Sequence, residues 1–518
     1  MEIIRHFPLI SIILTFICVV LTSFLNGKAS KIVTIVLDTI CIALGLSLLI
    51  GLIQSGTPYI EYALGHKAAP FCNQLRFGPY EAFLATLVPV VMLLSILAGD
   101  LHAKRDIVDT KLHSFYTLLN LAMVALLAII HTDDIFTGFV FLEISTLSSI
   151  GLTLIKNHGR QIAAALRYML FNLLGSGLFL LGCVFLYGET GYLSMSYIQK
   201  VITESFASNT NVLGLTIAFT LVSVGLSIKS GLFPFYYWMG DTYGVNTTTA
   251  SSVLSGLMAK GYIILLIKFI YRTFGLANVQ QTHLLTILLV FGACGMIFGS
   301  ITAIRQKVIN KMVSYSSAAQ IGYIFLGIGL GEAGLIAATF HLLAHALCKP
   351  LLFASSNRLI DCAGKKRKFE NLRGTGKEDK LAGIGFTVGS LSMVGCPFFV
   401  GFISKSLFIT DSLVDLSSPI QIFNAVVAIT ALVVSTLLNT IYYMKTVITI
   451  YSNNEEGNEL KKNKWDVPFI IGTSAFVILI IGLGLFPSSV IDVIESGIES
   501  LKTNGSTVIE TVVHLLGR

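Results

Sequence analysis

Seven ionisable side chains lie where a polypeptide rarely places charge. Each falls inside a run of residues that is long and apolar enough to cross a bilayer. A charge at the membrane centre costs at least about 2.5–3.5 kcal/mol on insertion scales, so such residues usually have a function. Because these are mostly basic and are spread over five predicted helices, they indicate a path for charge through the membrane. The seven residues are Glu143, Lys229, Lys260, His341, His345, Lys349 and Lys405.

The composition requires a membrane around most of the chain. Of 518 residues, 54% are hydrophobic and 12% are charged, and the mean hydropathy is +0.80. A soluble domain carries about 25% charged residues, and a spanning helix needs roughly 20 mostly apolar residues. Suitable windows cover residues 7–25, 32–53, 79–98, 114–131, 134–155, 163–187, 212–233, 249–271, 283–303, 309–330, 334–357, 381–411, 420–450 and 467–487. The sequence therefore predicts an all-α membrane protein with about fourteen transmembrane helices. We expect the first of these helices to be a membrane span rather than a signal peptide.

Basic residues concentrate in alternate loops. The loops after odd-numbered predicted helices are rich in Lys and Arg, and the others are neutral or acidic, with Arg272 in the eighth loop as a weak exception. The positive-inside rule then places the odd loops in the cytoplasm and both termini outside. Because the net charge of +7 resides in these loops, it does not indicate a nucleic-acid partner.

The cysteines do not indicate a cofactor. All eight are scattered along the chain and none forms a CxxC pair. An iron–sulfur cluster or a zinc site needs clustered ligands. No GxGxxG or P-loop motif opens a helix after a strand. We therefore expect no cofactor and no metal, and any redox centre would belong to another subunit.

Two predicted spans carry both a proline and a lysine. Residues 228–235 read Ile-Lys-Ser-Gly-Leu-Phe-Pro-Phe, and residues 395–405 begin Gly-Cys-Pro and end at Lys405. Proline removes a backbone donor and clashes with the preceding turn. Paired interruptions at corresponding places in two halves point to an inverted repeat and its ion sites. The separation of 176 residues between Lys229 and Lys405 equals about five helices, which predicts two inverted five-helix repeats, helices 4–8 and 9–13, with helices 7 and 12 broken.

The repeat predicts four segments. These are an N-terminal three-helix segment (1–110), the first repeat (111–275), the second repeat (276–455), and a last transmembrane helix with a surface tail (456–518). A shift of 176 residues from Glu143 lands near Ala319 and Gln320, so the second half has no acidic counterpart. The two halves are therefore expected to differ in role.

Six short motifs together resemble one family. They are Phe141–Glu143, Lys229–Trp238, Ala259–Tyr262, Asn310–Ser317, His341–Lys349 and Pro397–Lys405. The set resembles the proton-translocating antiporter-like subunits of Mrp-type Na⁺/H⁺ antiporters, of respiratory complex I and of energy-converting membrane hydrogenases. The lysine of the twelfth helix resembles the Mrp D-type subunit. The likeness covers roughly residues 110–450 and departs from the family where Tyr236, Tyr237 and Ser255 replace expected residues, including histidines.

The resemblance implies a function as well as a fold. It implies proton transfer by Glu143, Lys229, Lys260 and Lys405 in the inner membrane of a prokaryote. The implied partners are other membrane subunits, the lipid bilayer and protons, with Na⁺ as a second candidate ion. The chain would be a subunit without a redox centre of its own, within an antiporter, an NADH-quinone oxidoreductase or a membrane-bound hydrogenase.

The residues suggest an order of transfer. We expect Glu143 to pair with Lys229, which passes a proton toward Lys260. His341, His345 and Lys349 would relay it through the second half to Lys405, because histidine titrates near neutral pH.

Structural alternatives exist for most of these residues. Lys229 and Lys405 could snorkel to the headgroups. Lys260 could satisfy a carbonyl of broken helix 7, the two histidines could bond hydroxyls in the core, and Lys349 could be an interface anchor. Lys268 and Lys445, near predicted span ends, are expected as anchors. At the level of the whole chain, the alternatives are a stand-alone secondary transporter of a small solute and a structural subunit with idle charges.

Overall fold

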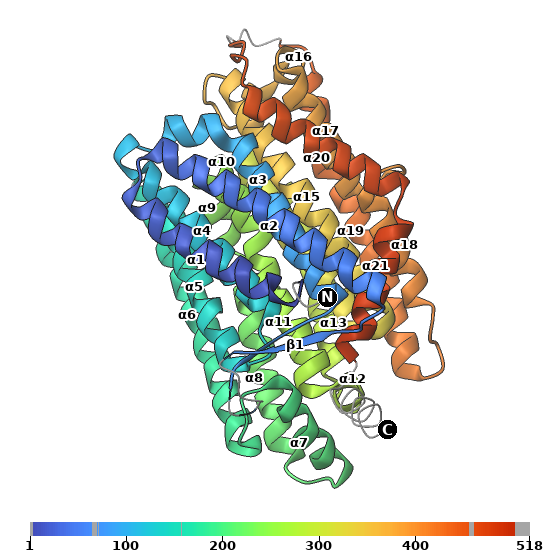
Figure 1. Cartoon of the computed structure of the whole chain (residues 1–518). Helices are drawn as coiled ribbons and strands as arrows, with labels where there is room; N and C mark the ends of the chain where they lie inside the picture. The colour runs from blue at the N-terminus through green and yellow to red at the C-terminus, as the bar shows by residue number, and fades with distance from the viewer. Residues whose placement is uncertain (1–3, 65–69, 71, 157, 455–459, 503–518) are drawn as a thin grey trace.

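The computed structural model describes every residue except 1–3, 65–69, 71, 157, 455–459 and 503–518. The described chain is a bundle of helices with one short hairpin (Figure 1). Twelve of its helices are long and apolar enough to cross a membrane. The other two predicted spans also contain helices, one continuous and one divided in two. The predicted all-α membrane fold is therefore confirmed.

The elements follow the predicted order. The first four spans contain η1 (Ile4–His6), α1 (Phe7–Phe24), α2 (Gly27–Ser55), α3 (Pro79–Asp106) and α4 (Asp109–His131). The next four contain α5 (Ile135–Leu154), α6 (Gly159–Thr190), α8 (Val212–Ser230), α9 (Trp238–Val245), α10 (Thr248–Val253), η2 (Leu254–Met258), α11 (Ala259–Lys268) and η3 (Phe269–Phe274). The last six contain α13 (Leu284–Ile304), α14 (Ile309–Gly329), α15 (Glu332–Cys362), α17 (Lys380–Val394), α18 (Val400–Ser412), α19 (Pro419–Tyr451) and α20 (Val467–Leu485). Shorter connecting helices are α7 (Met195–Ala207), α12 (Leu276–Gln280), η4 (Phe369–Leu372) and α16 (Thr375–Glu378).

The sequence does not predict two peripheral elements. Strands β1 (Ile60–Ala63) and β2 (Gln74–Phe77) pair antiparallel between α2 and α3. The expected surface tail begins with helix α21 (Ser488–Lys502), which buries Ile494 and Ile498 and packs against α3. The tail from residue 503 onward lies outside the described residues.

The seventh span is broken, as predicted. Helix α8 ends at Ser230, and Gly231 adopts a left-handed conformation with φ +77°. A Cβ at Gly231 would lie 2.1 Å from Cε of Met239, so only glycine fits this turn. Helix α9 resumes after Pro234, which has no backbone donor to offer.

The twelfth span is also broken, as predicted. Helix α17 ends at Val394, and both Gly395 and Phe398 have positive φ, +93° and +74°. A Cβ at Gly395 would lie 2.8 Å from Cδ of Lys405. The glycine therefore makes the turn and also leaves room for the lysine side chain.

A third interruption falls in the eighth span, where the sequence does not predict one. The span contains two π-helical segments, η2 and η3, on either side of α11. A π-helical turn releases backbone groups from the α-helical pattern and is frequent at functional sites. Segment η2 ends at Met258, two residues before Lys260.

The eighth span and α15 form the buried centre of the bundle. Residues Thr248–Phe274 are buried throughout their apolar window, and Glu332–Cys362 almost throughout. In Figure 1, α15 runs through the middle of the molecule. Helices α1, α2 and α6 instead expose apolar side chains such as Ile17, Ile50 and Leu170. A bilayer covers such an apolar face. The buried centre carries four of the seven ionisable residues that the sequence singles out, namely Lys260, His341, His345 and Lys349.

Candidate functional site

Lys229 and Glu143 form an ion pair beside the first helix break. The Lys229 ammonium lies 3.0 Å from Oε1 of Glu143 and donates to Oγ1 of Thr146 at 2.9 Å. Ser176 on α6 donates to the same carboxylate oxygen. The structure therefore brings the expected pair together and adds two hydroxyl partners that the sequence does not single out.

Contact between α6 and α8 fixes the lysine in place. A Cβ at Gly175 would lie 2.9 Å from Cγ of Lys229 and 2.8 Å from the carbonyl oxygen of Gly225. The Lys229 side chain is 0% exposed, whereas that of Glu143 is 32% exposed. A fully enclosed ammonium does not reach the headgroups, so Lys229 is not a snorkelling residue.

An aromatic hydroxyl network extends this pair. The Lys229 ammonium lies 5.6 Å from the ring centre of Tyr262, within cation–π range. The Tyr262 hydroxyl has Oγ of Ser145, Oγ1 of Thr146 and the Tyr168 hydroxyl at 3.4 Å each. Of these residues, the sequence analysis singles out only Tyr262, which is the last residue of the motif Ala259–Tyr262.

Lys260 is held by the π-helical segment of its own span. Its ammonium is buried and donates to the backbone carbonyl of Ser255 in η2. The structural alternative for Lys260 predicted a hydrogen bond to a backbone carbonyl of helix 7. Lys260 does bind a backbone carbonyl, but this carbonyl belongs to helix 8. The Ser255 hydroxyl in turn lies 2.9 Å from that of Ser317 on α14.

Lys349 lies on α15 inside the bundle. Its ammonium donates to Oγ of Ser316 at 2.5 Å, to the carbonyl of Val313 at 3.1 Å and to the Tyr443 hydroxyl at 3.3 Å. The residue is 0% exposed, which excludes the interface-anchor alternative. Ser316 and Ser317 are adjacent on α14, so this helix connects the surroundings of Lys349 with those of Lys260.

The two histidines differ in their contacts. Nδ1 of His341 lies 3.0 Å from the Ser404 hydroxyl, as the core-histidine alternative expects. Nε2 of His341 and both ring nitrogens of His345 are buried without a hydrogen-bond partner among the described residues. The His341 ring also stacks on Tyr323 at 5.0 Å. Within the described part of the chain, three imidazole nitrogens in the centre of the bundle therefore have no hydrogen-bond partner.

Lys405 is bound to the second helix break. Its ammonium donates to the carbonyl of Val394, the last residue of α17, at 2.7 Å and to Oγ1 of Thr436 at 3.1 Å. It also lies 5.3 Å from the ring centre of Tyr323, the ring on which His341 stacks. The lysine thus satisfies a carbonyl that the interrupted helix leaves without an α-helical partner.

The second half has no carboxylate for Lys405. Among the described residues, no Asp or Glu lies within ion-pair distance of its ammonium. Gln320, which is adjacent to the position that corresponds to Glu143 after the repeat shift, is buried on α14, and neither amide atom has a hydrogen-bond partner among the described residues. The sequence indicates that the second half lacks an acidic counterpart of Glu143, and the structure agrees among the residues that it describes.

Lys268 is not the interface anchor that the sequence suggests. Its side chain is 0% exposed. The ammonium donates to the carbonyl oxygens of Ile129 at 3.2 Å, Ile130 at 2.8 Å and Thr132. Lys268 therefore caps the C-terminal end of α4, where carbonyls lack intrahelical donors and the helix dipole favours a cation.

Replacing Lys268 with methionine should destabilise the fold. The change would leave buried carbonyls of α4 without donors, at about 1–3 kcal/mol of unfolding free energy. Thermal unfolding of the purified chain in detergent measures the effect. The control is Lys445→Met, because Lys445 is an exposed lysine on α19. Equal unfolding temperatures for the two variants would contradict the capping role.

Glu81 and Arg272 form a second buried ion pair. The guanidinium Nη2 lies 2.9 Å from Oε1 of Glu81, and both side chains are 0% exposed. The sequence places Arg272 in a loop, and this placement is wrong because η3 carries the residue into the protein interior, where it meets Glu81 in the first turn of α3. Arg272 is therefore no exception to the pattern of basic loops.

The arrangement has the features of an ion pathway. Each half has a broken helix with a buried lysine beside the break. Between them lie two further buried lysines and two histidines, surrounded by hydroxyls. Buried lysines, histidines and a carboxylate within a membrane are typical of ion and proton pathways.

These features define a class of multi-pass membrane proteins in which interrupted helices carry intramembrane ionisable groups. Comparison with known families is specific: the family described as NADH:quinone oxidoreductase/Mrp antiporter, TM, matches residues 132–435. The chain belongs to this family.

Individual relatives agree with the assignment. NADH-quinone oxidoreductase subunit N of Desulforudis audaxviator is 32% identical over 398 residues, which is 76% of each chain. A Staphylococcus aureus protein named as antiporter subunit mnhD2 is 28% identical over 495 residues, 95% of each chain.

Solved structures share the fold. A chain of the archaeal membrane-bound sulfane sulfur reductase, a respiratory membrane complex, superposes with a TM-score of 0.85 at 22% identity, covering 98% of this chain and 99% of that one. A chain of the Mrp complex from Dietzia sp. DQ12-45-1b gives 0.83 at 19% identity, with the same coverage. At these identities the likeness concerns the fold alone.

Proposed function

We propose that this chain is a proton-translocating membrane subunit of a multisubunit complex. The observation that carries the proposal is the buried Lys229–Glu143 ion pair next to a broken helix. An intramembrane pair of this kind changes its charge state when the partners separate. The names of the relatives place them in quinone-oxidoreductase and antiporter complexes, which supports partner subunits for this chain.

The proposed pathway has three parts. Glu143, Lys229 and Lys260 control proton uptake in the first half, and Lys405 releases the proton in the second. His341, His345 and Lys349 connect them. The α14 residues support this order, because Ser317 reaches the surroundings of Lys260 and Ser316 binds Lys349.

The proposal includes a topology. Residues 111–275 and 276–455 would be the inverted repeats, flanked by segments 1–110 and 456–518. The positions of Gly231 and Gly395, each at a helix break before a resumed helix, support this division. Both termini would lie on the outer side of a prokaryotic cell membrane. Transport of Na⁺ by the complex would depend on a partner subunit.

The experiment measures proton translocation by the complete complex in liposomes, with a pH-sensitive dye. Lys405→Ala should reduce the rate at least about tenfold, because a positioned proton donor is lost. Lys445→Ala is the matched control. A normal rate with normal assembly of the Lys405 variant would contradict the pathway. Uptake of a small solute by the lone chain would instead support a stand-alone transporter.

A further inference from the structure

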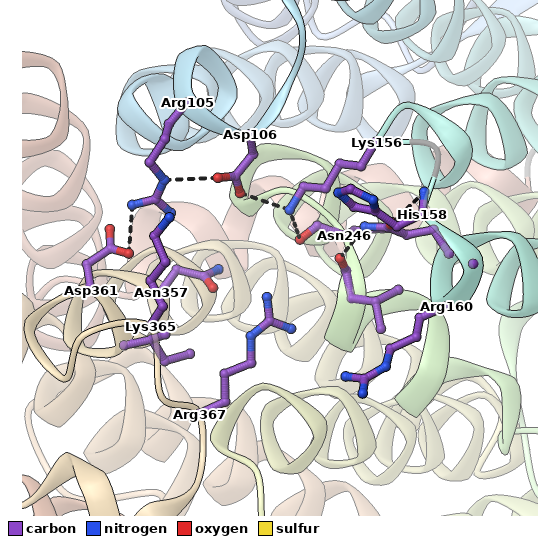
Figure 2. A pocket seen from close by; sticks show the side chains of 14 residues that line it. Arg105, Asp106, Lys156, His158, Arg160, Asn246, Asn357, Asp361, Lys365 and Arg367 are labelled. Atoms are coloured by element: carbon purple, nitrogen blue, oxygen red, sulfur yellow. Dashed lines mark hydrogen bonds and ion pairs between the residues drawn. The ribbon is translucent and has the colours of Figure 1, made fainter.

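A large polar pocket opens at the face that carries the basic loops. Its volume is about 770 Å³, within the range of small-ligand sites. Four segments that are distant in the sequence meet there: the end of α3, the residues around the start of α6, the end of α9, and the end of α15 with the residues after it (Figure 2). The proposed proton pathway uses none of its charged residues.

The pocket has a surplus of positive charge. Five cations and two carboxylates line it, which leaves three positive charges without counting His158. The lining cations are Arg105, Lys156, Arg160, Lys365 and Arg367. A surplus of this size in one concavity attracts multivalent anions.

Both carboxylates are already neutralised. Asp106 lies 2.9 Å from Nε of Arg105 and 2.8 Å from the Lys156 ammonium. Asp361 lies 2.7 Å from Nη1 of Arg105 and 2.9 Å from Nε2 of His102. Figure 2 shows the contacts of Arg105 with Asp361 and Asp106, and of Asp106 with Lys156, which together form a chain of ion pairs across one side of the view. Burial lowers the pKa of Lys156, and the Asp106 carboxylate opposes that shift.

The remaining three cations have no such partners. Among the described residues, no carboxylate lies within ion-pair distance of Arg160, Lys365 or Arg367. Their backbones are nevertheless fixed. Arg160 is in the first turn of α6, and the Lys365 amide donates to the carbonyl of Ile360 at 2.9 Å. The Arg367 carbonyl accepts from the amide of Ile309 at 3.3 Å.

The start of α6 adds to the positive potential. This helix has 32 residues, and the first amides of Gly159 and Arg160 have no intrahelical acceptor. A helix N-terminus favours anions, above all phosphate groups. Arginine binds phosphate through paired N–H donors, and Arg160 and Arg367 approach the same space from different segments in Figure 2.

We propose that this pocket binds a phosphate group, with Arg160, Arg367 and Lys365 as its ligands. A phosphate there would connect the N-terminal helices with both proposed repeats, because each contributes to the lining. The positive-inside rule alone explains why the loops are basic. It does not explain why three cations that have no carboxylate partner among the described residues line one cavity. The phosphate has two chemical sources, free inorganic phosphate and the headgroup of an anionic phospholipid, which occurs at such sites between membrane helices.

The test compares three forms of the full chain: wild type, the double variant Arg160→Gln/Arg367→Gln, and the control Arg305→Gln/Lys307→Gln. Both pairs of residues are exposed, so neither double variant should disturb folding. The control removes the same charge from an odd-numbered loop, outside the pocket. Equal unfolding temperatures in phosphatidylcholine nanodiscs establish that the three forms are comparable.

The first arm titrates inorganic phosphate into the detergent-purified chain by calorimetry. Wild type and control should bind, and the double variant should bind at least about tenfold more weakly, because two charge-assisted contacts are lost. Added NaCl should weaken binding by the two competent forms.

The second arm compares nanodiscs with and without phosphatidylglycerol. If inorganic phosphate does not bind, but the anionic lipid raises the unfolding temperature of wild type and control and not of the double variant, the ligand is a lipid headgroup. If the three forms behave alike in both arms, or bind neither probe, the site does not exist. Loss of proton translocation without loss of phosphate binding concerns the pathway and leaves this proposal standing.

Discussion

Replacing Lys229 with alanine should reduce proton translocation by the assembled complex about 100-fold or more, as expected when a positioned proton-transfer group is removed. The ammonium is enclosed by α5, α6 and α8, so no other lysine can substitute for it. The measurement is dye-detected proton movement in liposomes containing the whole complex. Lys445→Ala, on the exposed face of α19, is the matched control.

A second variant tests whether the pair acts as one unit. Glu143→Gln keeps a side chain that Ser176 and Lys229 can still contact but removes the carboxylate charge. It should lower transport about as much as Lys229→Ala, and the double variant should be no worse than either single one, since residues that act together are not additive. Additive losses would show that the two residues work independently.

Arg272→Met should produce the largest loss of stability. The substitution leaves the Glu81 carboxylate charged in a fully buried position, and breaking such a pair typically costs about 3–5 kcal/mol. Thermal unfolding of the purified chain should reveal a decrease well beyond that of Lys445→Met.

The double variant Glu81→Gln/Arg272→Met provides the control for this prediction. It removes both charges, so most of the lost stability should return, as it does when buried ion pairs are replaced by neutral groups. If Arg272→Met unfolds like the wild type, the ion pair contributes nothing and the buried position of Arg272 needs another explanation.

The broken helices could be predicted because their causes are local. Gly231 and Gly395 take left-handed conformations that other residues avoid, and a proline follows each of them within three residues. The same chemistry operates in any surroundings, so the sequence suffices. The ion pair of Glu143 with Lys229 was also foreseeable, because an uncompensated lysine inside a membrane needs a partner and few acids are available.

Features that depend on packing could not be predicted. Lys268 and Arg272 lie near the end of a span, where hydropathy alone indicates a water interface. Packing against α4, α3 and α7 makes these positions interior. The π-helical turn that offers the Ser255 carbonyl to Lys260 has no recognised sequence pattern. Hydroxyl residues such as Thr146 and Ser176 are common in membrane helices, so nothing in the sequence distinguishes the ones at the site.

Lys229 and Lys405, the lysines beside the two helix breaks, donate to different kinds of acceptor. Loss of a proton should therefore affect the position of their side chains in opposite ways. Lys405 donates to a neutral carbonyl and a neutral hydroxyl. An uncharged amine retains two N–H donors, so both contacts can survive and the side chain stays in place. Lys229 is held chiefly by a carboxylate, and that attraction disappears with the ammonium charge. In the proposed pathway, Lys405 would therefore carry a proton without moving, whereas Lys229 would separate from Glu143 each time it loses its proton.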